Sequence, residues 1–196
     1  MNTLSLSDVK FEMKTKKGYD FFEVSSAFQK SVRRGLEEEA LYWGIELFNS
    51  NYDEYLWKRI KIITSEDVGL ASINMPIIIE ALYNNYTEQK KKKDEKNRPE
   101  RLFLIHAILL LVRAPKSRLV DWTLISFFNN HETDDREIPE YALDNHTIRG
   151  KKMGRNYKYF YDESSKLNNH TLLDKEEERK KLAKDSEENK KKAQLF

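Results

Sequence analysis

The sequence contains no cysteine, which excludes disulfides and thiolate metal sites and fits a reducing compartment. Glycine and proline are scarce, at 6 and 4 of 196 residues, and this scarcity favours helices over sheets. No apolar run approaches the ~18 residues of a membrane span, because the longest block, 102–112, is short and interrupted by His106. The N-terminus lacks the apolar core of a signal peptide. We therefore expect a soluble, cytoplasmic chain that does not enter a membrane.

Sequence motifs for catalysis are also missing. The 196 residues contain no Gly-x-x-x-x-Gly-Lys-Ser/Thr loop to cradle a phosphate and no Gly-x-Ser-x-Gly nucleophile turn. The four histidines share no i, i+3 or i, i+4 spacing, so no zinc motif is present. His106 lies in an apolar stretch and is expected to be a hydrogen-bonded core residue. The sequence predicts a chain that is not an enzyme and holds no cofactor or metal.

The composition that remains is rich in charge and in aromatic residues. Charged residues make up 35% of the chain, but the net charge is only +2, which argues against a dedicated non-specific DNA binder. Aromatic residues, at 12%, indicate a real core. The length allows one domain of about 150 residues with appendages.

Apolar residues recur at helical spacing through most of the chain. The breaks at Gly35, at Asn49–Asn51 and before Pro76, Pro99 and Pro139 separate short helices, which pack naturally as antiparallel hairpins. The predicted class is all-α, with stacked antiparallel helical hairpins and a charged C-terminal tail. The expected helices cover residues 19–34, 36–49, 53–63, 76–86, 100–114, 116–130 and 140–153.

Three regions follow from this pattern. Residues 1–18 form an N-terminal arm that could hold a short edge strand within 4–13. Residues 19–168 form the helical domain, whose last part, 155–167, is expected to be irregular and to pack its aromatic side chains on the core. Residues 169–196 form a charged tail, either a single exposed helix or disordered.

A polar turn interrupts the helical pattern after residue 63. Ser65, Glu66 and Asp67 could supply a metal or catalytic acid pair, but no histidine or third carboxylate lies nearby at ligand spacing. We therefore favour a structural turn in which these residues cap a helix. Arg59 is expected to pair with one of the acids, and Gly69 to permit a close backbone approach.

One basic segment is the best candidate for contact with nucleic acid. Its cations could bind phosphates and its tyrosines could stack on bases. The alternative is a solvated helix end followed by packed tyrosines. The candidate contacts are Arg149, Lys151, Lys152, Arg155, Tyr157 and Lys158.

Several large aromatic residues could belong to a subunit interface, where such side chains are enriched. The candidates are Trp43, Trp57, Trp122 and Phe128. Alternatively, all of them lie in the core, and the sequence does not separate the two.

Four segments carry a resemblance to a known family. They are Ala-Leu-Tyr-Trp at 40–43, Ile-Ile-Thr-Ser-Glu-Asp-Val-Gly-Leu-Ala at 62–71, Ala-Pro-Lys-Ser at 114–117 and Asn-Tyr-Lys-Tyr at 156–159. In that order they resemble the C-terminal helical region of the replication-associated recombination AAA+ ATPases, the RarA/MgsA and Werner-interacting group. The resemblance covers about residues 19–163, and it implies a region that assembles subunits into a tetramer behind an ATPase ring.

Because these residues include no ATPase machinery, we expect a stand-alone copy of the assembly domain, encoded by a phage or mobile element. The resemblance implies a non-catalytic oligomerisation and protein-interaction module in DNA replication, recombination or repair. Its expected partners are further copies of itself, as a dimer or tetramer, and a replication or recombination ATPase. The alternative is a protein that binds DNA directly through residues 149–158.

Overall fold

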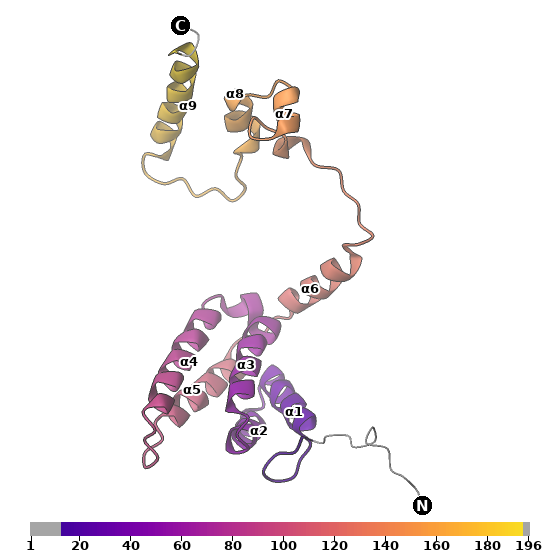
Figure 1. Ribbon diagram of the computed structural model, residues 1–196, viewed down its shortest axis with the longest axis vertical. Helices are drawn as coiled ribbons and strands as arrows, with labels where there is room; N and C mark the ends of the chain where they lie inside the picture. The colour runs from indigo at the N-terminus through magenta and orange to yellow at the C-terminus, as the bar shows by residue number, and fades with distance from the viewer. Residues whose placement is uncertain (1–12, 194–196) are drawn as a thin grey trace, which may run out of the picture. The chain divides into compact units, whose positions relative to one another are not determined.

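The computed structural model describes the backbone of residues 13–193 and the side chains of residues 13–186, and this part of the chain is helical (Figure 1). It contains no strand, only an isolated antiparallel bridge between Lys14 and Asp20, which confirms the all-α class. The strand considered for residues 4–13 lies outside the described residues, Met13 excepted. The chain divides into two compact units, Met1–Glu132 and Thr133–Phe196. None of the described helices is both long enough and apolar enough to cross a bilayer.

Five helices build the bundle of the first unit. Consecutive helices pack as hairpins, α1 on α2 and α4 on α5, and α5 also contacts α1, α2 and α3 (Figure 1). The expected stacked hairpins are therefore present. The helices are α1 (Phe21–Arg34), α2 (Glu37–Asn49), α3 (Asp53–Ile63), α4 (Met75–Lys91) and α5 (Glu100–Arg113).

The ends of α1 show how local sequence sets a helix boundary. The Asp20 side chain accepts the backbone N–H groups of Phe22 and Glu23, each at 2.9 Å, and so caps the first turn. Gly35 ends the helix in the left-handed conformation at φ 71°, which glycine adopts without a steric penalty. By contrast, Asp53 is the first residue of α3 rather than its cap, and its carboxylate accepts from Tyr86 at 2.6 Å.

The core lies between these five helices. Phe28, Trp57 and Ile108 are almost fully buried in it. Gly44 lets α2 approach its neighbours, since a Cβ there would lie 2.7 Å from the Ile108 side chain and 3.2 Å from the Phe28 ring. The prediction that His106 is a core residue is wrong: it is exposed, because α5 buries the stripe that includes Ile108 instead.

After α3 the chain departs from regular α-helical geometry and turns. It continues into a π-helical turn, η2 (Thr64–Val68), and a 3₁₀ turn, η3 (Gly69–Ser72), before α4 begins. A π-helical turn is uncommon and often marks a functional position. The helix α6 (Leu119–Asn130) follows α5, contacts η2 and η3, and buries none of its residues. In Figure 1, α6 leaves the bundle rather than packing along it.

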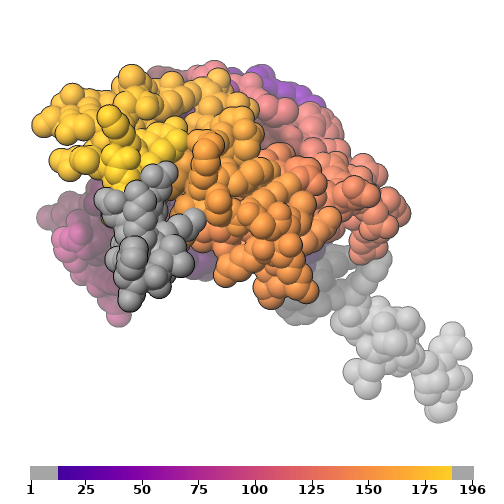
Figure 2. All heavy atoms as spheres, turned by 90° about the horizontal axis from the view of Figure 1, so that it is seen from above, coloured from indigo at the N-terminus to yellow at the C-terminus, as the bar shows by residue number. Residues whose placement is uncertain are grey.

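The second unit is built from short helical pieces, drawn in orange to yellow (Figures 1 and 2). Figure 2 shows the atoms of its orange part gathered into one small cluster. The pieces are η4 (Glu140–Ala142), α7 (Ile148–Lys152), α8 (Tyr157–Tyr159), η5 (Phe160–Ser164) and α9 (Glu176–Ala193). The charged tail therefore takes the helical alternative over residues 176–193.

Two expectations for this unit are wrong. The helix predicted over 140–153 breaks at 143–147, because Asp144 accepts the N–H of His146 at 2.8 Å and Thr147 accepts that of Gly150 at 3.0 Å. Such side-chain bonds to the backbone compete with helix formation. Residues 155–167 were expected to be irregular but are helical over 157–164, where Asn156 caps α8 by accepting from Tyr159 at 3.3 Å.

Candidate functional site

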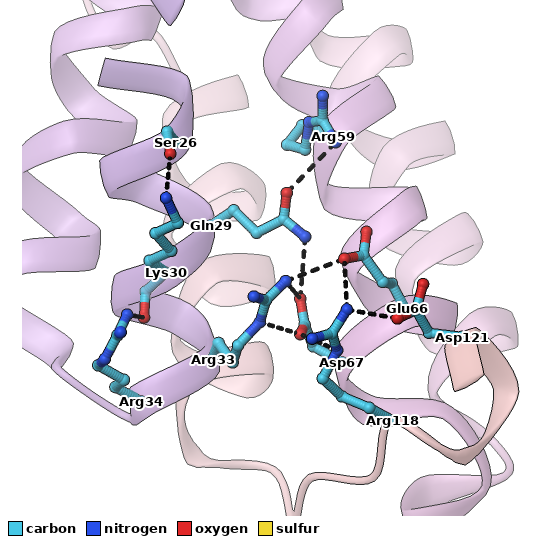
Figure 3. A network of polar contacts seen from close by, with 10 residues as sticks. All are labelled: Ser26, Gln29, Lys30, Arg33, Arg34, Arg59, Glu66, Asp67, Arg118 and Asp121. Carbon is cyan, nitrogen blue, oxygen red and sulfur yellow. Dashed lines mark hydrogen bonds and ion pairs between the residues drawn. The ribbon is translucent and has the colours of Figure 1, made fainter. Parts of the chain in front are cut away.

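The polar turn after α3 is a network of arginines and carboxylates (Figure 3). Asp67 is fully buried, and its carboxylate accepts from Gln29 at 3.1 Å and from the guanidinium of Arg33. Glu66 accepts from Arg33 at 2.9 Å and from Arg118 at 3.4 Å. The network therefore joins α1, η2 and the residue that precedes α6. The hydrogen bond that Arg33 donates to Asp67 raises the pKa of Arg33 despite the opposing effect of burial, so this arginine stays charged.

Arg118 extends the network to α6. It pairs with Asp121, its Nε lies 3.8 Å from the Asp67 carboxylate, and its guanidinium stacks 4.5 Å from the centre of the Trp122 ring. Because Asp121 and Trp122 are the third and fourth residues of α6, these contacts fix the first turn of that helix. A planar guanidinium suits this position, since it bonds carboxylates and stacks on a ring at once.

Backbone contacts also hold η2 against the segment that links α5 to α6. Gly69 has φ 50°, and a Cβ on it would come within 3.0 Å of the carbonyl oxygen of Ser117. The N–H of Ser117 donates to the carbonyl of Asp67 at 2.9 Å. Lys116 closes the end of α5 by donating to three backbone carbonyls, among them that of Ala114 at 2.7 Å, and burial lowers the pKa of this lysine. The segment between α5 and α6 is thus tied to η2.

Arg59 does not take the place that the sequence suggested. It donates to Gln29 at 3.3 Å and to the Tyr55 hydroxyl at 3.1 Å, whereas Arg33 and Arg118 bind the acids. The expected pairing of Arg59 with an acid is therefore wrong, because the two cations that reach the acids come from α1 and from the start of α6. The expected capping role is replaced by side-chain ion pairs. Within the described residues, no group of three His, Cys, Asp or Glu is arranged to hold a metal ion.

One feature of the sequence indicates that Asp67 belongs to such a network. Leu56, Ile60, Ile63 and Asp67 recur at spacings of four, three and four residues, and the first three are fully buried. The pattern places a carboxylate at a core position, where a charge requires a cationic partner. The identity of that partner, Arg33, lies 34 residues earlier and is set by tertiary packing alone.

A groove opens beside the network, with a volume of about 710 Å³. Its walls come from α3, η2, α4 and α6, and α6 contributes Val120, Asp121 and Leu124. Ser65 also lines the groove, together with Trp57, Ile62 and Tyr83 on the opposite walls. The site therefore combines a rigid polar base with a largely apolar cleft.

The four aromatic residues considered for an interface fall into different places. Trp57 is 1% exposed and belongs to the core, so it cannot anchor an outer surface, although its edge lines the groove. Trp43 is half-buried, stacks edge-on against Tyr19 at 5.5 Å and donates to Glu39 at 3.1 Å. Trp122 and Phe128, both on α6, are 57% and 76% exposed.

The basic segment is also divided by the structure. Arg155 bonds the carbonyl of Leu143 at 2.7 Å and stacks 4.3 Å from the centre of the Tyr159 ring. Lys158 pairs with Asp162 at 2.8 Å. These contacts hold the second unit together, as does the edge contact of Tyr157 with the His146 ring at 5.9 Å. Arg149, Lys151 and Lys152 are exposed on the five-residue helix α7, and Lys158 is exposed as well although it is paired.

Comparison of the sequence with known proteins identifies a family and several relatives. The model of a family described as "MgsA AAA+ ATPase C terminal" matches residues 37–195. The chain is similar to replication-associated recombination protein A of Escherichia coli (strain K12), at 31% identity over 157 residues that cover 76% of this chain and 33% of that protein. The protein of the same name from Bacillus subtilis (strain 168) is 28% identical over 153 residues, which cover 74% of this chain and 34% of that protein. The chain thus spans about a third of the length of these relatives.

Proposed function

The chain belongs to the family of MgsA AAA+ ATPase C-terminal regions, and from this membership we propose that it is a non-catalytic oligomerisation and protein-interaction module. The resemblance carried by the segments at 40–43, 62–71, 114–117 and 156–159 is thereby confirmed as a family relationship. The homology implies a replication and recombination context, because the matched relatives are named replication-associated recombination proteins. The proposed role is to bring subunits together in that context.

The observation that carries the proposal is the exposure of α6. This helix buries none of its residues, and among its side chains Trp122, Phe127 and Phe128 are 57%, 61% and 76% exposed. Large exposed apolar surface is unfavourable in water and marks interaction sites. Aromatic residues in particular are enriched at protein interfaces. An apolar helix fixed at its first turn by Arg118 is suited to holding a second subunit.

The partner in this proposal is a further copy of the chain, in a dimer or tetramer. A replication or recombination ATPase is a second proposed partner, because the matching family model is described as the C terminal of an AAA+ ATPase. We therefore propose the assembly role for the matched residues, 37–195.

The test is the mass in solution, measured by light scattering behind a sizing column over a range of protein concentrations. We expect a mass of two or four times 23.4 kDa, with the larger species favoured at higher concentration. A mass of 23.4 kDa at every concentration would contradict the proposal that the chain assembles by itself. A pull-down on a replication ATPase would then decide whether a heterologous subunit is required.

A second function is favoured by one observation on the second unit. Arg149, Lys151 and Lys152 lie exposed within five residues of one another on α7, a spacing that suits phosphate contacts. We infer a weak contact with single-stranded DNA there, measured by fluorescence anisotropy. Replacing all three with alanine should weaken binding. The slope of the logarithm of the binding constant against the logarithm of the salt concentration should become shallower by about 0.7 per lost phosphate contact. Residues 179–181, Arg-Lys-Lys on α9, provide a control triple of equal charge. Equal losses in the two triples would contradict a site at α7.

A further inference from the structure

The apolar residues of α6 are not spread evenly around the helix. At about 100° per residue, five of them fall within an arc of about 160°. They are Val120, Leu124, Ile125, Phe127 and Phe128, and we call them the α6 face. Trp122 lies outside this arc, where the Arg118 guanidinium stacks on its ring. Ser126 and Asn130 lie on the opposite side.

The α6 face is continuous with the groove. Val120 and Leu124 form one wall of it, and Phe127 follows Leu124 one turn later on the same side of the helix. The N-terminal half of the face therefore lines a cleft, while the C-terminal half ends in two exposed phenylalanines. A surface that carries both a cleft and large apolar side chains is complementary to a copy of itself turned by 180°.

We propose that the α6 faces of two copies dock antiparallel about a two-fold axis, so that Phe127 and Phe128 of each copy enter the groove of the other. This inference rests on the proposed assembly function and specifies the surface and the geometry through which it acts. An antiparallel arrangement is required because the groove is lined by the N-terminal half of α6. The phenylalanines at the C-terminal half reach that position only when the second helix runs in the opposite direction.

Charge favours this pairing over a parallel one. The only charged residue of α6 is Asp121, which Arg118 already binds, so the two faces bring no unpaired like charges together. Lys58 and Lys61 line the groove, and the three carboxylates that also line it are each paired with a basic side chain, Glu54 with Lys90, Glu66 with Arg33 and Asp121 with Arg118. The C-terminal end of the arriving helix carries partial negative charge on its last carbonyls, and lysines near that end are favourable.

The exposed area is sufficient for such a contact. Phe127 and Phe128, 61% and 76% exposed, together present on the order of 250 Å² of apolar surface. Val120, Leu124 and Ile125 are 37%, 54% and 44% exposed, and the groove walls add further area. These five side chains together present on the order of 500 Å², which approaches the ~600 Å² per partner at the lower end of specific interfaces.

The absence of cysteine makes a direct test simple, because a single introduced cysteine has no competitor. Leu124→Cys lies near the centre of the α6 face, and Ser126→Cys lies on the opposite side of the same helix. Under mild oxidation we expect a covalent dimer from Leu124→Cys and none from Ser126→Cys. Cross-linking of both variants to the same extent, or of neither, would overturn the inference.

A matched pair of substitutions tests the energetics. Phe127 and Leu119 are similarly exposed, at 61% and 56%, but only Phe127 lies on the α6 face. We expect Phe127→Ser to weaken self-association at least tenfold and Leu119→Ser less than threefold, by light scattering. Neither residue is buried, so circular dichroism should show the helical content unchanged in both.

Self-assembly of the chain and docking through the α6 face are tested separately. A wild-type chain that is monomeric at every concentration would contradict the assembly function and the inference together. A wild-type oligomer that survives Phe127→Ser and does not cross-link through Leu124→Cys would retain the assembly function and overturn the inference alone. In that case another surface of the chain joins the subunits.

Discussion

Replacing Asp67 with asparagine removes a fully buried charge while almost preserving the size of the side chain. In the native chain this carboxylate faces Arg33 and Arg118, and Gln29 donates to it at 3.1 Å. Asparagine keeps one acceptor oxygen but presents an N–H group to at least one cation. We therefore expect a loss of stability in the first unit, with the largest effect where η2 meets α1 and α6.

The size of the loss follows from burial. Removing one partner of a buried ion pair costs roughly 3–5 kcal/mol, because an uncompensated charge remains. The side chains of Arg33 and Arg118 are 27% and 28% exposed, and both keep Glu66 as a partner. These features move the estimate to the lower end of the range, about 3 kcal/mol. That is a large fraction of the ~5–15 kcal/mol that stabilises a typical domain.

Urea unfolding followed by tryptophan fluorescence measures this loss. All three tryptophans, Trp43, Trp57 and Trp122, lie in the first unit, and Trp57 is 1% exposed, so the signal reports on that unit. With a denaturant slope of about 2 kcal/mol per molar, a loss of about 3 kcal/mol lowers the midpoint by ~1.5 M. The slope itself should not change if the transition remains two-state.

Asp121→Asn is the control for a charge at the edge of the same network. The Asp121 carboxylate pairs with Arg118 and is 12% exposed, so its loss should cost about 1 kcal/mol. The reasoning would be refuted if Asp67→Asn cost no more than Asp121→Asn. That result would mean that the buried carboxylate is dispensable and that packing alone fixes the turn.

Two further predictions concern the second unit. Gly150→Ala should destabilise this unit by about 2 kcal/mol, because a Cβ would lie 2.0 Å from the Asp144 carbonyl oxygen. Hydrogen exchange measures this loss, and unchanged exchange would contradict the tight packing of α7. Hydrogen bonds from Lys158 and Lys184 lower the pKa of Asp162 from 3.8 to about 2, so its stabilising contribution is present above pH ~3.8 and is lost as the pH falls through about 2. An NMR titration should show a midpoint near 2 that rises in Lys184→Ala, and an unchanged midpoint in that variant would exclude the pairing.

Helix boundaries in the first unit were largely predictable, because they depend on neighbouring residues. Gly35 and Pro76 fix a helix end and a helix start through their own backbone preferences. The helices expected at 36–49, 53–63 and 100–114 match α2, α3 and α5 to within one residue at each end. In the second unit the same reasoning failed over 143–147, where Asp144 bonds the backbone in place of a helical turn.

The sequence alone determined the helical class, the order of the helices in the first unit and the family, since periodicity and short segments encode all three locally. Tertiary structure alone decided which side chains meet. It placed Arg33 rather than Arg59 against Asp67, and it buried Trp57 while leaving Trp122 exposed. These outcomes depend on how whole helices pack across dozens of residues, because burial and pairing are properties of the assembled bundle and not of any short stretch of chain.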